Sequence, residues 1–183
     1  MTILAEQTES AIPTGTWRID PVWSALEFEV KKIGIAAIKG RALGFEGTVV
    51  GGPASAVEGR VDVSSLTTFD ETRDGHLQSP DFFDAERYPT LAFRSTSVEK
   101  RDGELVVHGE LTIKGHTRPL ELRGRLVGTG VDPMGNDRIA LELAGTIDRT
   151  DFGLNWNAPL PGGGSMLPNE VLLTATFAAV RAA

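Results

Sequence analysis

The sequence predicts an all-β protein: a single closed, antiparallel, up-and-down barrel of about eight strands with one short helical insert. Three observations support this fold class. Apolar and polar residues alternate along most of the chain, short turn signals join the alternating segments, and the stretch near residues 70–84 breaks the alternation. A period of two is typical of half-buried antiparallel strands, and closing such a sheet removes its unpaired edges.

The strands are expected where the alternation is sustained. Strand signals start at Thr16, and in the first sustained segment Leu26, Phe28 and Val30 alternate with charged residues. Every second side chain of a strand faces the same side of the sheet, so each segment has one apolar face. The sustained segments span residues 26–30, 57–63, 105–113, 120–126, 139–147 and 171–177.

The connections favour hairpins between strands that are neighbours in sequence. Residues 100–103 end in a glycine that can adopt positive φ, and residues 114–116 join two segments almost without a loop. Residues 131–138 form a longer hairpin loop, and residues 159–169 form the longest irregular segment. Glycines also interrupt the apolar rows, where they either relieve crowding or leave volume for a ligand: Gly59, Gly109, Gly124 and Gly145.

The helical insert is expected to start at Asp70, which is a good N-cap residue. Ser79 and Pro80 then predict a second helical start, because proline lacks only an N–H that the first helical position does not use. An apolar insert at one end of a barrel suggests a lid or plug over a cavity. The first helix carries Arg73, His76 and Leu77.

Composition excludes several classes of function. The formal net charge is −7, whereas nucleic-acid binding needs a clustered basic face. The chain has no cysteine, which removes disulfides and thiolate chemistry. No secretory signal and no membrane-spanning segment is recognisable, so a cytoplasmic protein is expected. Residues 1–14 are interpreted as a flexible tail, and residues 15–183 as the barrel domain.

One local basic cluster is left open between two interpretations. It is either the solvated edge of a strand or a contact for an anionic head group. The cluster consists of Lys31, Lys32, Lys39 and Arg41.

Catalysis and metal binding are not expected. The three histidines, His76, His108 and His116, are far apart in sequence, and a metal needs convergent ligands. A hydrolase remains the less favoured alternative, with Ser64 or Ser65 as nucleophile, His76 as base, and Asp81 or Asp84 as its partner. No G-x-S-x-G elbow supports this alternative.

Six ordered motifs resemble the YceI-like family of polyisoprenoid-binding, lipocalin-like barrel proteins. The resemblance covers roughly residues 16–180. The family usually has histidine where Trp23 stands and often a second histidine where Lys32 stands, so any head-group contact that those histidines make in other members is absent here. The motifs are WRIDPVWSALEFEV (17–30), KGRALGFEGTV (39–49), VDVSSLTT (61–68), RDGHLQSPDFFD (73–84), GELTIKGHTRPL (109–120) and DFGLNWN (151–157).

The resemblance implies a long apolar cavity that holds an isoprenoid quinone, a prenyl phosphate or a similar amphiphile, and often a homodimer. No other cofactor is expected. The implied role is storage or transport without a covalent step, and the alternative is a filled barrel that acts as a structural or stress-response interaction module. Arg73 and His76 are the candidates for the head group or rim. The candidate tail-binding residues are Trp17, Phe28, Val30, Phe45, Leu77, Phe82, Phe83, Phe93, Leu111, Trp156 and Phe177.

Overall fold

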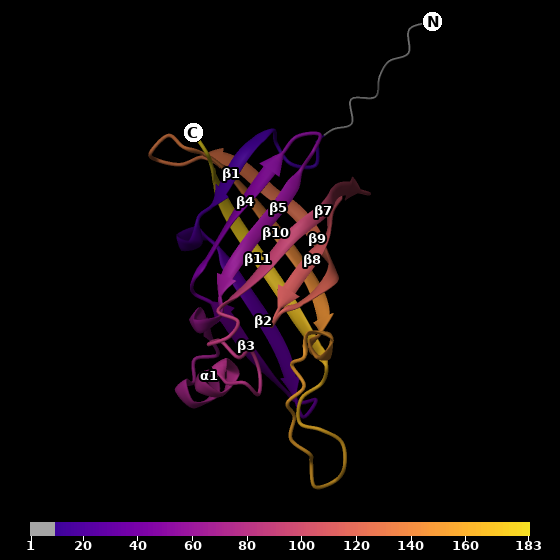
Figure 1. Ribbon diagram of the computed structural model, residues 1–183. Coiled ribbons are helices and arrows are strands. Elements are labelled where there is room, and N and C mark those ends of the chain that lie inside the picture. The colour runs from indigo at the N-terminus through magenta and orange to yellow at the C-terminus, as the bar shows by residue number, and fades with distance from the viewer. Residues whose placement is uncertain (1–9) are drawn as a thin grey trace, which may run out of the picture.

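The strands of the barrel lie where the alternating segments predict them, as the computed structural model shows for residues 10–183 (Figure 1). Their inward positions are apolar, so pairing them edge to edge buries one continuous face. The strands are β1 (Gly15–Ile19), β2 (Ala25–Lys32), β3 (Ala36–Ala42), β4 (Phe45–Gly51), β5 (Ala56–Asp62), β6 (Leu66–Thr67), β7 (Thr90–Arg101), β8 (Glu104–Ile113), β9 (His116–Val131), β10 (Asp137–Asp148) and β11 (Glu170–Arg181).

The barrel closes as a ring of eight antiparallel strands when β1 with β2, and β3 with β4, are each counted as one interrupted strand. The sheet order is β1-β4-β5-β7-β8-β9-β10-β11, and β11 pairs back onto β1. β11 also pairs with β2, because β1 and β2 form one long strand that is interrupted by the 3₁₀ turn Pro21–Trp23. β4 and β3 continue each other in the same way, opposite β1 and β2. The predicted up-and-down barrel is confirmed.

The helical insert is α1 (Glu71–Gln78), which lies at one end of the barrel between β6 and β7 (Figure 1). Asp70 is its N-cap as predicted, and its carboxylate accepts the backbone N–H of Arg73 at 2.9 Å. This bond satisfies one of the donors that a helix start leaves unpaired.

The second helical start predicted at Ser79 and Pro80 is wrong, because turns follow α1 instead. The backbone N–H groups of Phe83 and Ala85 donate to carbonyl oxygens of Leu77 and Gln78, at 3.0 and 2.9 Å. These bonds satisfy carbonyls at the end of α1 and fold the following chain back against the helix.

Side chains fill the end of the barrel opposite α1. Ile12 is fully buried there, and its carbonyl accepts the backbone N–H of Gly52 at 3.1 Å. The tail predicted over residues 1–14 is therefore too long, because residues 10–14 pack on the barrel; residues 1–9 lie outside the described part. The filled end consists of Ile12, Trp17, Val49, Leu105, Val107, Ile139, Leu141, Leu143 and Ala179.

Two phenylalanines inside the barrel lie over glycines of neighbouring strands. A Cβ at Gly40 would collide with the Phe28 ring, and a Cβ at Gly109 would come within 2.5 Å of the Phe93 ring. At Gly109 the missing side chain therefore makes room for an aromatic ring, which favours the packing interpretation of that glycine.

The end of the barrel beside α1 also carries the long loop over residues 153–169 (Figure 1). The backbone N–H of Ile33 in the β2–β3 turn donates to the carbonyl of Met166 at 3.0 Å, which attaches the loop to the barrel. Within residues 10–183, no helix has both the length and the apolar character that crossing a membrane requires.

Candidate functional site

Two adjacent chambers occupy the part of the barrel that side chains do not fill. The outer chamber has a volume of about 680 Å³ and lies against α1, and the inner chamber of about 180 Å³ lies deeper. Their shared lining is apolar, so the chambers follow one another along the barrel interior. The shared residues are Phe28, Leu66, Leu91, Leu111 and Leu173.

The structure brings most of the predicted site residues to these chambers. Phe28 and Leu111 line both of them. The inner chamber adds Phe45, Phe93 and Phe177. The outer chamber adds Val30, Arg73, His76, Leu77, Phe82, Phe83 and Trp156.

Trp17 is the one predicted tail-binding residue that lines neither chamber. It is 2% exposed in the filled end, its Nε1 donates to the carbonyl of Pro13 at 2.9 Å, and the Arg181 guanidinium lies 4.3 Å from its ring. The alternating pattern identifies the inward face of a strand, but it does not tell which part of that face is filled.

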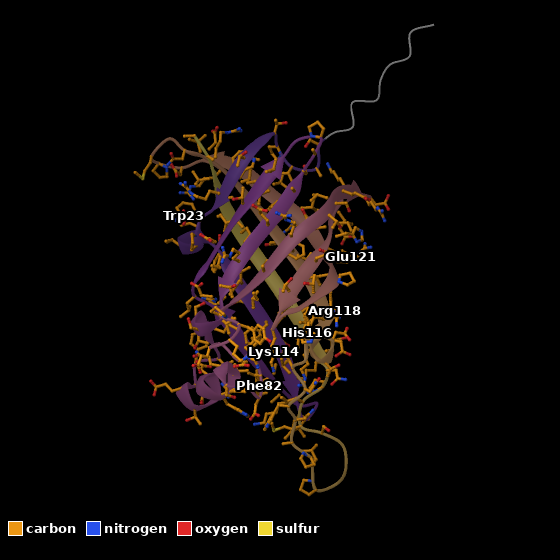
Figure 2. The ribbon with its side chains drawn as sticks, viewed as in Figure 1. Trp23, Phe82, Lys114, His116, Arg118 and Glu121 are labelled. Atoms are coloured by element: carbon orange, nitrogen blue, oxygen red, sulfur yellow. The ribbon has the colours of Figure 1, made fainter. Side chains whose placement is uncertain are left out.

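Three rings connect the helical insert to the long loop at the wall of the outer chamber. His76 on α1 lies edge-on to Phe82 and to Trp156, with ring centroids 5.1 and 4.7 Å apart. Phe82 and Trp156 are 5.4 Å apart, and Phe82 lies at the α1 end of the barrel (Figure 2). His76 Nε2 is also 2.9 Å from Asp81 Oδ2. These contacts involve no strand pairing, so the hydrogen bonds of the barrel sheet do not depend on them.

Arg73 ties the insert to the barrel rim through Thr68. Its Nε donates to Thr68 Oγ1 at 2.7 Å and its Nη2 to the Thr68 carbonyl at 2.9 Å. Asp74 accepts bonds from Thr67 Oγ1 and from the backbone N–H and hydroxyl of Thr68, at 2.7, 2.7 and 2.6 Å. Burial opposes ionisation of Asp74, but the Thr68 and Thr67 bonds and the Arg73 charge outweigh it, so the pKa of Asp74 lies below its usual value.

The residues of the basic cluster predicted on the early strands have different surroundings: some form surface ion pairs and one lines the cavity. Arg41 pairs with Glu27 at 2.7 Å and Lys39 with Glu29 at 3.7 Å, directly across β2 and β3. Lys32, in contrast, is half-buried and lines the outer chamber.

Arg149 is a site residue that the sequence analysis missed. It begins the 3₁₀ turn Arg149–Phe152 after β10, is 4% exposed, and lines the outer chamber. Burial lowers the pKa of its guanidinium from the ordinary value, although arginine stays protonated in proteins. The sequence feature that could have indicated it is its position just after the apolar row of residues 139–147, because that strand ends where the insert lies.

The hydroxyl of Ser65 bonds to backbone carbonyls and not to the histidine that a hydrolase would need. Ser65 Oγ donates to the carbonyls of Asp62 and Gly44, at 2.7 and 3.2 Å, while His76 bonds to Asp81. Among residues 10–183, no three His, Asp or Glu side chains are grouped so that they could hold a metal ion.

Comparison with known proteins agrees with this geometry. The profile of the YceI-like domain matches residues 17–179. The chain belongs to the YceI-like family. A UPF0312 protein of Vibrio cholerae serotype O1 is 37% identical over 136 residues, which is 72% of each chain. The resemblance predicted from the motifs is therefore confirmed.

Solved structures share the YceI-like fold. BcnA of Burkholderia cenocepacia matches with a TM-score of 0.75 at 21% identity, over 87% of this chain and 98% of BcnA. A polyisoprenoid-binding domain of Saccharophagus degradans, implicated in plant cell wall breakdown, matches with a TM-score of 0.66 at 16% identity, over 91% and 98%. At these identities the similarity shows the barrel architecture alone.

Proposed function

We propose that this protein binds an amphiphile with a long apolar tail, a polyisoprenoid such as an isoprenoid quinone or a prenyl phosphate, and stores or transports it. The observation that carries the proposal is the pair of adjacent apolar chambers inside the closed barrel. The outer volume of about 680 Å³ lies within the usual range of ligand sites, roughly 300–1,000 Å³. The polyisoprenoid-binding neighbour of the same fold supports the ligand class.

Burial of a tail supplies enough free energy for such binding. Each buried methylene contributes about 0.8 kcal/mol, so one five-carbon isoprene unit contributes at most roughly 4 kcal/mol before ordering costs. Two or three units therefore reach the roughly −8 kcal/mol of micromolar affinity. The same arithmetic gives weak discrimination between tails of similar length, because one methylene is worth little.

The tail would pass the contact between the insert and the long loop. His76 on α1 and Trp156 on the loop meet at the outer chamber, and neither contributes to the hydrogen bonding of the barrel sheet. Opening this contact exposes the outer chamber while the inner residues Phe45 and Phe177 stay in place. Binding by shielding the tail from water requires no covalent step, so we propose a carrier rather than an enzyme.

A pair of substitutions on β11 tests the proposal. Leu173 lines both chambers, whereas its neighbour Leu172 is 39% exposed on the outside of the barrel. Leu173→Trp should block the interior, and Leu172→Trp adds the same ring in solvent. Both proteins are titrated with a fluorescent fatty acid, which geranylgeraniol then displaces.

We expect uptake and displacement by the native protein and by Leu172→Trp, and at least tenfold weaker binding by folded Leu173→Trp. Mass spectrometry of an organic extract of the native protein then identifies any co-purified lipid. If the native protein takes up neither probe nor isoprenoid, the carrier proposal is refuted and the filled-barrel interaction module gains weight. Equal binding by both variants would place the lipid outside the barrel.

A further inference from the structure

The charged side chains that line the outer chamber are mostly positive, whereas the net charge of the protein is negative. The chain has a formal net charge of −7, yet the outer chamber is lined by Lys32, Arg73 and Arg149. Asp70 is the carboxylate of the described residues that shares this lining, and its Oδ1 already caps α1. A cationic chamber in an acidic protein indicates a ligand of opposite charge.

Arg149 is held rigidly in this chamber by three backbone carbonyls. Its Nε donates to Pro168 at 2.9 Å, and its Nη1 donates to Leu154 at 2.6 Å and to Trp156 at 2.8 Å. No hydrogen bond to a described residue uses Nη2, and no buried side-chain nitrogen is left unpaired within residues 10–183. Nη2 is therefore unbonded and not fully buried, and Arg149 is a lining residue of the outer chamber.

The carbonyls satisfy N–H groups of Arg149 but do not neutralise its charge. Within the described chain, Arg149, Lys32 and Arg73 form no ion pair with a carboxylate. The adjacent Asp148 instead accepts the backbone N–H and hydroxyl of Thr150, at 2.9 and 2.5 Å. The charge of Asp148 acts on the guanidinium without forming an ion pair, but burial outweighs it and lowers the pKa of Arg149. An anionic oxygen placed on Nη2 would stabilise the buried charge further.

We propose that Arg149 binds an anionic head group through its free Nη2, with Lys32 and Arg73 adding positive charge around the same chamber. The inference rests on the proposed function and refines it: the ligand is an isoprenoid that ends in a phosphate or a similar anion, rather than a neutral quinone. The tail extends from the head group toward the inner chamber.

Two ligands that share one tail test this assignment in the native protein. Geranylgeranyl monophosphate and geranylgeraniol differ only in the charged group, and calorimetric titration at fixed ionic strength measures both affinities. Hydrogen bonds to charged groups predict that the phosphate binds roughly tenfold to a hundredfold more tightly. Inorganic phosphate, titrated alone, reports whether the anion binds without a tail.

Single substitutions test which residues cause the tighter binding of the phosphate. Arg149→Gln should remove most of the phosphate advantage and leave the affinity for geranylgeraniol unchanged. Because Arg149 also holds the loop, Lys32→Gln provides a second test: it removes a charge from the chamber without breaking a hydrogen bond to a described residue, and should reduce the advantage severalfold. Arg118→Gln on the exposed surface of β9 is the matched control.

The outcomes separate the two proposals. Equal affinities for phosphate and alcohol in the native protein refute the head-group inference and leave the carrier proposal standing. An unchanged phosphate advantage in both Arg149→Gln and Lys32→Gln also refutes it. Inorganic phosphate that binds as tightly as the lipid would assign a site for a free anion instead. If neither isoprenoid binds, the carrier proposal itself fails.

Discussion

Replacement of Trp156 by alanine should speed release of the bound lipid, because the Trp156 ring connects the long loop to the helical insert. The ring makes two aromatic contacts, with His76 at 4.7 Å and with Phe82 at 5.4 Å. Such contacts are worth about 0.5–1.5 kcal/mol each beyond their buried area, or about 1–3 kcal/mol together. If both are lost before the lipid leaves, dissociation becomes roughly 5- to 150-fold faster.

The substitution leaves the backbone anchor of the loop in place. Arg149 Nη1 still reaches the carbonyl of residue 156, at 2.8 Å in the native protein, so the loop should keep its course. Trp156→Phe retains a ring and should restore most of the slow dissociation. Trp23→Ala is the control for loss of a tryptophan, because Trp23 is 56% exposed and lies above the insert, outside the α1 end of the barrel (Figure 2).

The assay is stopped-flow displacement of a fluorescent fatty acid by excess unlabelled lipid. A dissociation rate of Trp156→Ala equal to that of the native protein would refute the reasoning, since the ring contacts would then not limit release. The same would follow if Trp23→Ala accelerated dissociation to the same extent, because the effect would not depend on the contact between loop and insert.

Two further predictions concern stability. Ile12→Ala should lower the free energy of unfolding by about 2–5 kcal/mol, because Ile12 is fully buried in the filled end; urea denaturation measures this, and no change would show that residues 10–14 do not support the barrel. The pKa of Asp74 is lowered in the folded protein, so its stabilisation of the insert is present above the ordinary value of 3.8 and is lost as pH falls through the folded pKa. Protection of the α1 amides against hydrogen exchange, corrected for the intrinsic pH dependence of exchange, should therefore fall only in strong acid, whereas Asp74→Asn should lower it at neutral pH. Protection in the native protein that does not change in acid would contradict the prediction.

The local rules that the sequence follows account for most of the fold. Alternation placed the long strands, and Asp70 marked the start of α1 because N-capping involves residues only three apart. The prediction of a second helix at Ser79 and Pro80 was wrong because the backbone N–H groups of the following residues bond to the last carbonyls of α1 instead of starting a new helix. That pairing depends on how the chain folds back, which a capping rule does not describe.

The candidate site was predictable in its apolar part and not in its charged part. Phe28, Leu111 and Phe177 follow from strand periodicity, which places them inside the barrel. Arg149 lies in a turn, where a charged residue is ordinarily solvated, and only the packing of residues 153–169 over it encloses the guanidinium. Burial of this turn residue is decided by how the following loop folds back over it.

By itself, the sequence determined the all-β class, the order of the strands, the helical insert and the family, because each depends on periodicity, short-range capping or ordered motifs. Only the tertiary structure decided that one end of the barrel is filled around Ile12 and Trp17 while the other holds two chambers. Whether the interior is filled at a given height of the barrel depends on how the inward side chains of all its strands pack together there. That relation among distant residues arises only when the barrel closes.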